Sequence, residues 1–85
     1  ALIGVVGVSE HGLSIAHEED GMVKRKIISQ AEQVIALADH SKIGRTDFFQ
    51  YAELSDIDLL ITDRLPDKEF QRLLDQHGVE LLLAE

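Results

Sequence analysis

The stretch VIALADHSK, residues 34–42, joins an unbroken apolar run to a cluster of polar side chains. Three other short runs, residues 1–8, 57–62 and 79–84, resemble its apolar half in being rich in Val, Ile, Leu and Ala. Such nearly continuous runs are typical of parallel strands that are covered on both faces. The sequence therefore predicts four strands in a sheet with both faces covered.

Two of the segments between these runs have the spacing of helices. The second helix begins near Pro66 and ends at Gly78, with apolar residues on one stripe between them. The first helix spans residues 18–32, and acidic residues fill its first turn, where the positive end of a helix favours them. Its predicted core face consists of residues three or four positions apart, namely Val23, Ile27, Ala31 and Val34.

The order strand, helix, strand, loop, strand, helix, strand predicts the fold class. It is typical of an α/β protein with an open, mainly parallel sheet and flanking helices. The long irregular segment, residues 39–56, is a candidate functional loop because it exceeds the usual length of such a connection. We expect its aromatic residues Phe48, Phe49 and Tyr51 to pack the loop onto the sheet, with a pocket wall or a subunit contact as the alternative.

Length and composition limit the possible classes of protein. The 85 residues allow one domain, and the 45% hydrophobic fraction is that of a globular chain. A net charge of −8 works against direct binding to the nucleic-acid backbone. The absence of cysteine excludes disulfides and thiolate metal sites, so a reducing cytoplasm is the expected location. No apolar stretch approaches the roughly 20 residues that cross a bilayer, and we expect no membrane partner.

The chain starts directly in an apolar run, without an initiator Met. A chain of this size buries only about 60% of its unfolded surface, so its core gains from an additional surface. We therefore expect residues 1–85 to be part of a larger domain.

Polar residues follow the predicted strands at the edge where ligands gather in open α/β sheets. Residues 7–12 follow the first run, residues 39–45 the second and Asp63 the third. In the second of these segments, Asp39 can accept hydrogen bonds from a polyol, while Ser41, Lys42 or Arg45 can hold an anion. The alternative is that Asp39 and Ser41 only turn the chain while the two cations are solvated.

Other candidate sites are weaker. Lys24 or Arg25 is a possible anion contact within the basic cluster of residues 24–26, which is otherwise a solvated helix face. The four histidines lack metal-ligand spacing, so we expect no metal site. Gly4 and Gly7 do not complete a dinucleotide fingerprint, and we expect no cofactor.

Several blocks, taken in order, resemble the C-terminal half of the effector-binding domain of DeoR-family bacterial transcriptional regulators. The specific blocks are ALADHSKIGR, residues 36–45, and LSDIDLLITD, residues 54–63, supported by GLS at 12–14, VKR at 23–25 and GVE at 78–80. The resemblance covers nearly the whole chain and implies a fold like that of ribose-phosphate isomerases and CoA transferases. It further implies that residues 1–85 are the C-terminal part of a sensor domain for a phosphorylated sugar or related metabolite.

The resemblance also implies roles for residues and partners. Asp39 and Lys42 would line the effector site, with Ser41 nearby. Operator DNA would be bound only through a winged helix-turn-helix domain that residues 1–85 do not contain. The usual member of such a family is a repressor of a sugar-utilisation operon, and we expect a homo-oligomer.

Two alternatives remain at this point. Ribose 5-phosphate isomerases carry a similar Ala-Asp-x-Ser-Lys block, but they need a carboxylate base. Here Lys24 or Arg25 stands where that base would fall, and Val6 replaces an expected strand-end Asp, so we expect no enzyme and no catalytic residue. The other alternative is an assembly module that pairs through exposed sheet edges and the aromatic loop.

Overall fold

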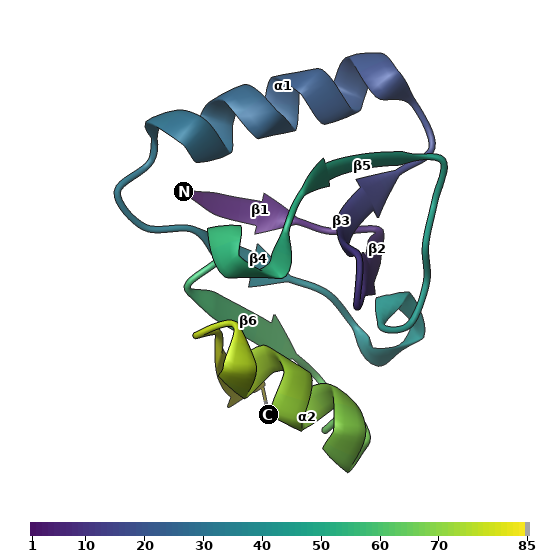
Figure 1. The fold of residues 1–85 in the computed structure, drawn as a ribbon, viewed down its shortest axis with the longest axis vertical. Coiled ribbons are helices and arrows are strands. Elements are labelled where there is room, and N and C mark those ends of the chain that lie inside the picture. The colour runs from purple at the N-terminus through teal and green to yellow at the C-terminus, as the bar shows by residue number, and fades with distance from the viewer. Residues whose placement is uncertain (85) are drawn as a thin grey trace.

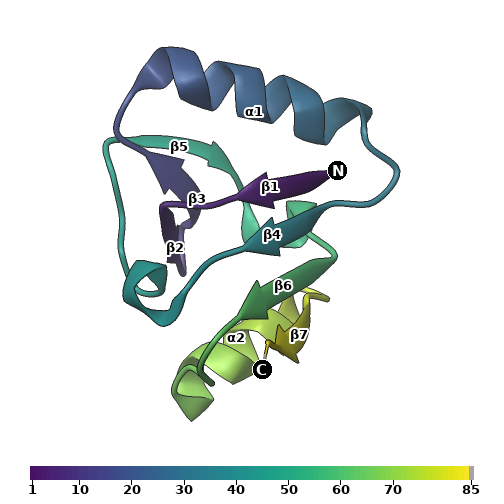
Figure 2. The same cartoon turned by 180° about the vertical axis from the view of Figure 1, so that it is seen from behind.

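The computed structural model describes residues 1–84, which form two sheets and two helices (Figures 1 and 2). The strands are β1 (Leu2–Gly4), β2 (Gly7–Ser9), β3 (Gly12–Ile15), β4 (Ile35–Leu37), β5 (Phe49–Ala52), β6 (Leu59–Thr62) and β7 (Glu80–Leu83). The helices are α1 (Glu18–Gln30) and α2 (Lys68–Gln76), and two short 3₁₀ turns span His40–Lys42 and Leu54–Asp56. Helix α1 lies beside β1 and β5, whereas α2 lies at the opposite end, beside β6 and β7 (Figures 1 and 2).

Four strands form a wholly parallel sheet in the order β1-β4-β6-β7. The four apolar runs supply these strands, as predicted. The register pairs Ile3 with Ala36 and Ala36 with Leu60, so the same face of the sheet is apolar across these three strands. The predicted α/β fold with a mainly parallel sheet is confirmed.

A second, antiparallel sheet in the order β2-β3-β5 was not predicted from the sequence. The run at residues 1–8 is not one strand, because β1 ends at Gly4 and β2 begins at Gly7. The turn between β2 and β3 depends on Gly12, whose φ of 113° favours glycine. A Cβ on Gly12 would lie 2.1 Å from the carbonyl oxygen of Ala52, so β5 packs directly against its backbone.

The segment at residues 39–56 is less irregular than the sequence suggested. It contains β5 and both 3₁₀ turns, and it supplies hydrogen bonds to two buried serines of the small sheet. Asp47 N donates to Ser14 Oγ (2.8 Å), and Thr46 Oγ1 donates to Ser9 Oγ (2.9 Å). The start of the segment is tied to β2, because Gly44 N donates to the carbonyl of Val8 (2.6 Å).

The aromatic residues of this segment behave differently from one another. Tyr51 is 2% exposed and belongs to the core, and Phe49 packs against that core, as predicted. Phe48 is 85% exposed, so the prediction that it packs onto the sheet is wrong. Phe49 and Tyr51 point to the same side of β5 because strand residues alternate, and Phe48 lies just before the strand.

The parallel sheet is covered on one face only within residues 1–84. Ile3, Ala36 and Leu60 lie at most 6% exposed on the covered face. Along each strand, the residues that alternate with these buried ones point to the other, open face, where Leu2 is 65% exposed and Leu37 40% exposed. The expectation that both faces are covered is therefore wrong for the described residues.

Helix α1 forms at the predicted place but presents a different face. Gly21 is buried, and Ile28 and Ala31 pack against the core. Val23 and Ile27 are 61% and 44% exposed, so the predicted core face is wrong for these two residues. The cause is the close approach of Phe49. A Cβ added to Gly21 would lie 2.2 Å from the Phe49 ring, so only the Gly21 side of the helix can pack this closely against β5.

Helix α2 agrees with its sequence signals. Asp67 Oδ1 caps the start of the helix by accepting a hydrogen bond from Phe70 N (2.8 Å). Gly78, with a φ of 74°, takes the chain out of the helix after its last turn. Leu74 is buried beneath it. Neither helix among residues 1–84 has the length and apolar character needed to cross a membrane.

Candidate functional site

The polar cluster after β4 is organised by a short turn. Asp39 stands just before the 3₁₀ turn His40–Lys42, and its Oδ1 accepts from Ser41 N (2.9 Å) and from the Ser41 hydroxyl. Lys42 Nζ lies 3.3 Å from Asp39 Oδ2 and 3.3 Å from Ser41 Oγ. Asp39 and Ser41 thus do cap the turn, and the same contacts gather a carboxylate, a hydroxyl and an ammonium at one strand end.

The contacts around Asp39 fix its charge. The Ser41 hydroxyl and backbone N–H donate to the carboxylate, and with the Lys42 ammonium they hold the pKa of Asp39 below its ordinary value of 3.8. The side chain is 51% exposed. Asp39 is therefore an ionised acceptor at neutral pH that a ligand can reach.

A second pair connects the same turn to the next strand. His40 N donates to Asp63 Oδ1 (2.7 Å), and His40 Nδ1 lies 3.0 Å from Asp63 Oδ2. These hydrogen bonds lower the pKa of Asp63 below its ordinary value of 3.8, and the bond from the His40 ring has the larger effect. The turn therefore holds carboxylates at the ends of both β4 and β6.

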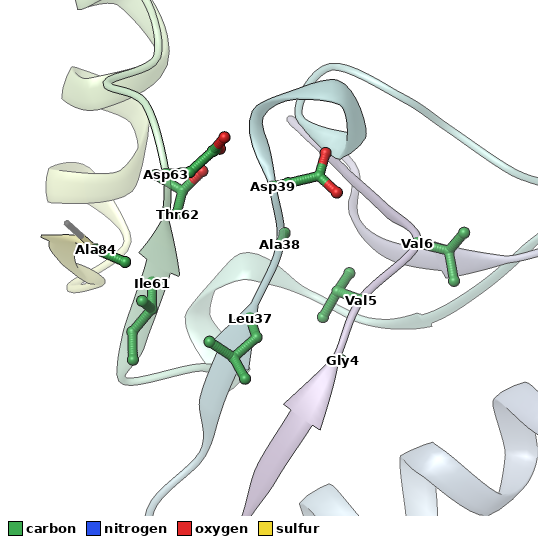
Figure 3. Close-up of a pocket in the computed structure, with 10 residues that line it drawn as sticks. All are labelled: Gly4, Val5, Val6, Leu37, Ala38, Asp39, Ile61, Thr62, Asp63 and Ala84. Atoms are coloured by element: carbon green, nitrogen blue, oxygen red, sulfur yellow. The ribbon is translucent and has the colours of Figure 1, made fainter.

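An open cavity of about 380 Å³ lies at the carboxyl ends of the parallel strands (Figure 3). The Asp39 and Asp63 carboxylates stand above it, while apolar side chains make up most of its wall (Figure 3). Among the described residues, 1–84, no basic side chain lines it. The lining residues are Gly4, Val5, Val6, Leu37, Ala38, Asp39, Ile61, Thr62, Asp63 and Ala84.

The structure gathers some of the sequence candidates and separates others. Asp39, Ser41 and Lys42 lie together in the turn, with only Asp39 in the cavity wall. Lys24 reaches β1, where its Nζ donates to the carbonyl of Gly4 (3.1 Å), a residue of that wall. Arg45 instead pairs with Asp47, Nε to Oδ2 being 3.4 Å, and does not line the cavity.

Sequence reasoning placed Asp63 at the right edge of the sheet but did not select it as a site residue. It treated His40 only as a possible metal ligand. The available signal was the position of Asp63 directly after the third apolar run, because the carboxyl ends of parallel strands meet at one edge. Within residues 1–84, no group of three or more His, Cys, Asp or Glu side chains gathers in a way that could hold a metal ion.

Comparisons with known proteins agree on one family. A family model described as the DeoR C terminal sensor domain matches residues 1–64. The chain is 75% identical over 85 residues to the HTH-type transcriptional repressor GlcR of Bacillus subtilis, covering 100% of this chain and 33% of that protein. It is 36% identical over 73 residues to the HTH-type transcriptional regulator GlpR of Haloferax volcanii, covering 86% of this chain and 29% of that protein.

A third relative is the glycerol-3-phosphate regulon repressor of Escherichia coli, which is 28% identical over 84 residues, 98% of this chain and 33% of that protein. The chain thus spans about a third of the length of the curated relatives it matches. These relatives are transcriptional regulators and not enzymes. With the family model matching 64 of its 85 residues, the chain belongs to the family of DeoR C-terminal sensor domains.

Proposed function

We propose that this chain is the ligand-sensing part of a DeoR-type repressor that binds a phosphorylated sugar without turnover. Membership of the sensor-domain family supports this proposal, as does the name of the E. coli relative, which refers to a phosphorylated polyol. The observation that carries it is the segment 39–42, in which Asp39 and the turn that follows it bring a carboxylate, a hydroxyl and an ammonium together beside the cavity at the strand ends.

The proposed contacts follow the chemistry of each group. Asp39 accepts hydrogen bonds from sugar hydroxyls, while Lys42 and Ser41 donate to the anionic end of the ligand. Lys24, on the β1 side of the cavity, supplies a second cation. Arg45 is engaged with Asp47 and is left out of the proposed contacts.

Sensing requires that the ligand prefer one of two conformations. A ligand shifts their equilibrium only by the difference between its affinities for them. Because a net charge of −8 works against a direct DNA contact, we place operator binding in a winged-helix domain outside residues 1–85 and the whole protein in the cytoplasm, where the operator lies.

Self-association is a second role that one observation favours. The open face of the parallel sheet exposes Leu2 and Leu82, and exposed apolar surfaces of this kind mark interfaces. We propose that the full-length protein is a homo-oligomer. Sedimentation of that protein as a monomer at high concentration would contradict this.

Calorimetric titration of the full-length protein with phosphorylated hexoses, pentoses and glycerol phosphate tests the sensing role. Lys42→Ala should weaken binding of the preferred ligand about ten- to a hundredfold, because it removes a charged hydrogen-bond donor. Lys68→Ala on α2 is the matched control and should change nothing. Equal affinity in the Lys42→Ala variant and the wild type would remove Lys42 from the site.

A further inference from the structure

The cavity at the strand ends is lined by two carboxylates that occupy equivalent positions on neighbouring strands. Leu37 of β4 pairs in register with Ile61 of β6, and Asp39 and Asp63 each stand two residues beyond this pair. Side chains two residues apart along an extended chain point to the same side. Figure 3 shows both carboxylates at the same rim of the cavity, above Leu37 and Ile61.

Both carboxylates are already oriented by the turn that separates them in the sequence. Ser41 and Lys42 hold Asp39, whereas the backbone and ring of His40 hold Asp63. The pKa of each is lowered by these bonds, so each is an ionised acceptor with lone pairs left for a ligand. Each side chain is about half exposed, Asp39 at 51% and Asp63 at 50%.

This pair of charges determines which part of a ligand fits. Two carboxylates repel a phosphate, and Lys42, the cation that pairs with Asp39, lies outside the cavity wall. Hydroxyl groups, by contrast, donate hydrogen bonds to carboxylates, and the C–H groups of a sugar can pack on the Val5, Leu37 and Ile61 surface.

The wall of the cavity also holds a polar atom without a partner. Thr62 is 2% exposed, and its Oγ1 makes no hydrogen bond. Figure 3 shows this oxygen beside the Asp63 carboxylate, on the side that faces Asp39. A buried hydroxyl without a partner is costly, so an additional polar group at this wall would be stabilising.

We propose that Asp63, oriented by His40, is a specificity-determining residue that accepts ligand hydroxyls opposite Asp39. The cavity then binds the polyol end of the ligand, and the phosphate lies outside it. This inference rests on the proposed sensing function and adds that hydroxyl groups remote from the phosphate are recognised by a pair of acids.

The test compares ligands that carry the same anion with and without hydroxyls. The full-length wild type and the Asp63→Asn variant are titrated with glucose 6-phosphate, ribose 5-phosphate and inorganic phosphate. The affinity for inorganic phosphate is also measured by competition against whichever sugar phosphate binds. Asp63→Asn should weaken sugar-phosphate binding about tenfold, while inorganic phosphate binds equally or more tightly because a repelling charge is gone. Asp75→Asn, an exposed acid on α2, is the control and should match the wild type.

The possible outcomes separate this inference from the function on which it rests. If the wild type binds no sugar phosphate, both fail. If it binds one and Asp63→Asn binds it with unchanged affinity, the role of Asp63 is overturned and the sensing function stands. Equal weakening of sugar phosphate and inorganic phosphate would also overturn it, because Asp63 would then act only by positioning the turn. Should Asp63→Asn not fold, Asp63→Glu keeps the charge but displaces it; it should weaken sugar-phosphate binding and leave inorganic phosphate binding unchanged, and unchanged binding of both would overturn the role of Asp63.

Discussion

The two sheets of the molecule enclose their residues to different degrees. Val8 and Leu13 in the antiparallel sheet are 0% exposed, and Tyr51 is 2% exposed. In the parallel sheet, Leu60 is equally buried, but Leu37 and Leu82 on the opposite face are 40% and 51% exposed. The antiparallel sheet is thus the enclosed part of the fold, whereas the parallel sheet combines a buried face with an open face and a polar rim.

This difference shows that apolar sequence and actual burial are separate properties. The parallel strands have the more continuous apolar runs, yet they are the less enclosed. The antiparallel strands include buried Gly and Ser residues, and the hydroxyls of Ser9 and Ser14 are hydrogen-bonded by Thr46 and by the backbone of Asp47. The candidate site follows the same division, because it lies at the rim of the open sheet.

The largest expected effect comes from glycines in the two sheets. Gly12→Ala in the antiparallel sheet should destabilise the protein by more than about 4 kcal/mol, because the methyl group meets the Ala52 carbonyl and the backbone has positive φ. Gly4→Ala in the parallel sheet meets nothing within 4 Å and should be nearly neutral. Urea unfolding of both variants measures the difference, and similar losses would contradict the contrast between the sheets.

A second pair of substitutions compares leucines. Leu13→Ala should cost about 3 kcal/mol, because the residue is 0% exposed and its removal leaves a cavity. Leu37→Ala on the open face should cost less than about 1 kcal/mol. The same unfolding measurement applies. If Leu37→Ala proved as costly as Leu13→Ala, the open face would be covered in the full-length protein.

A smaller effect is expected at alkaline pH and belongs to the enclosed sheet alone. Burial raises the pKa of Tyr51 from 10.0 to about 12, and its hydroxyl makes no hydrogen bond. Because the folded state holds this proton more tightly, its stabilisation is complete below pH 10 and is lost as the pH rises towards 12, by about 2–3 kcal/mol. Tyr51→Phe should abolish this loss while preserving stability at pH 7, and an alkaline loss identical in both proteins would show that the phenol is not its source.

The parallel sheet and its polar rim could be predicted because they depend on local sequence. Each parallel strand is a separate apolar run, and the rule that strand ends meet at one edge places Asp39 and Asp63 together. The antiparallel sheet could not be predicted, because the burial of Ser14 depends on Asp47, which is 33 residues away. The face of α1 was mispredicted for the same reason, since Phe49, distant in the sequence, determines which side of Gly21 points inward.

The contact between Gly44 and Val8 gives the site a mechanical connection to the rest of the fold. The turn that orients both acids continues directly into Gly44, whose N–H is bonded to the carbonyl of Val8, and Val8 also bridges to Ile43. Val8 is completely enclosed, so it has no room to move alone. A metabolite that displaces the turn must therefore also displace β2. The β2–β3 hairpin is thus the first part of the fold that would move when a ligand binds at the rim.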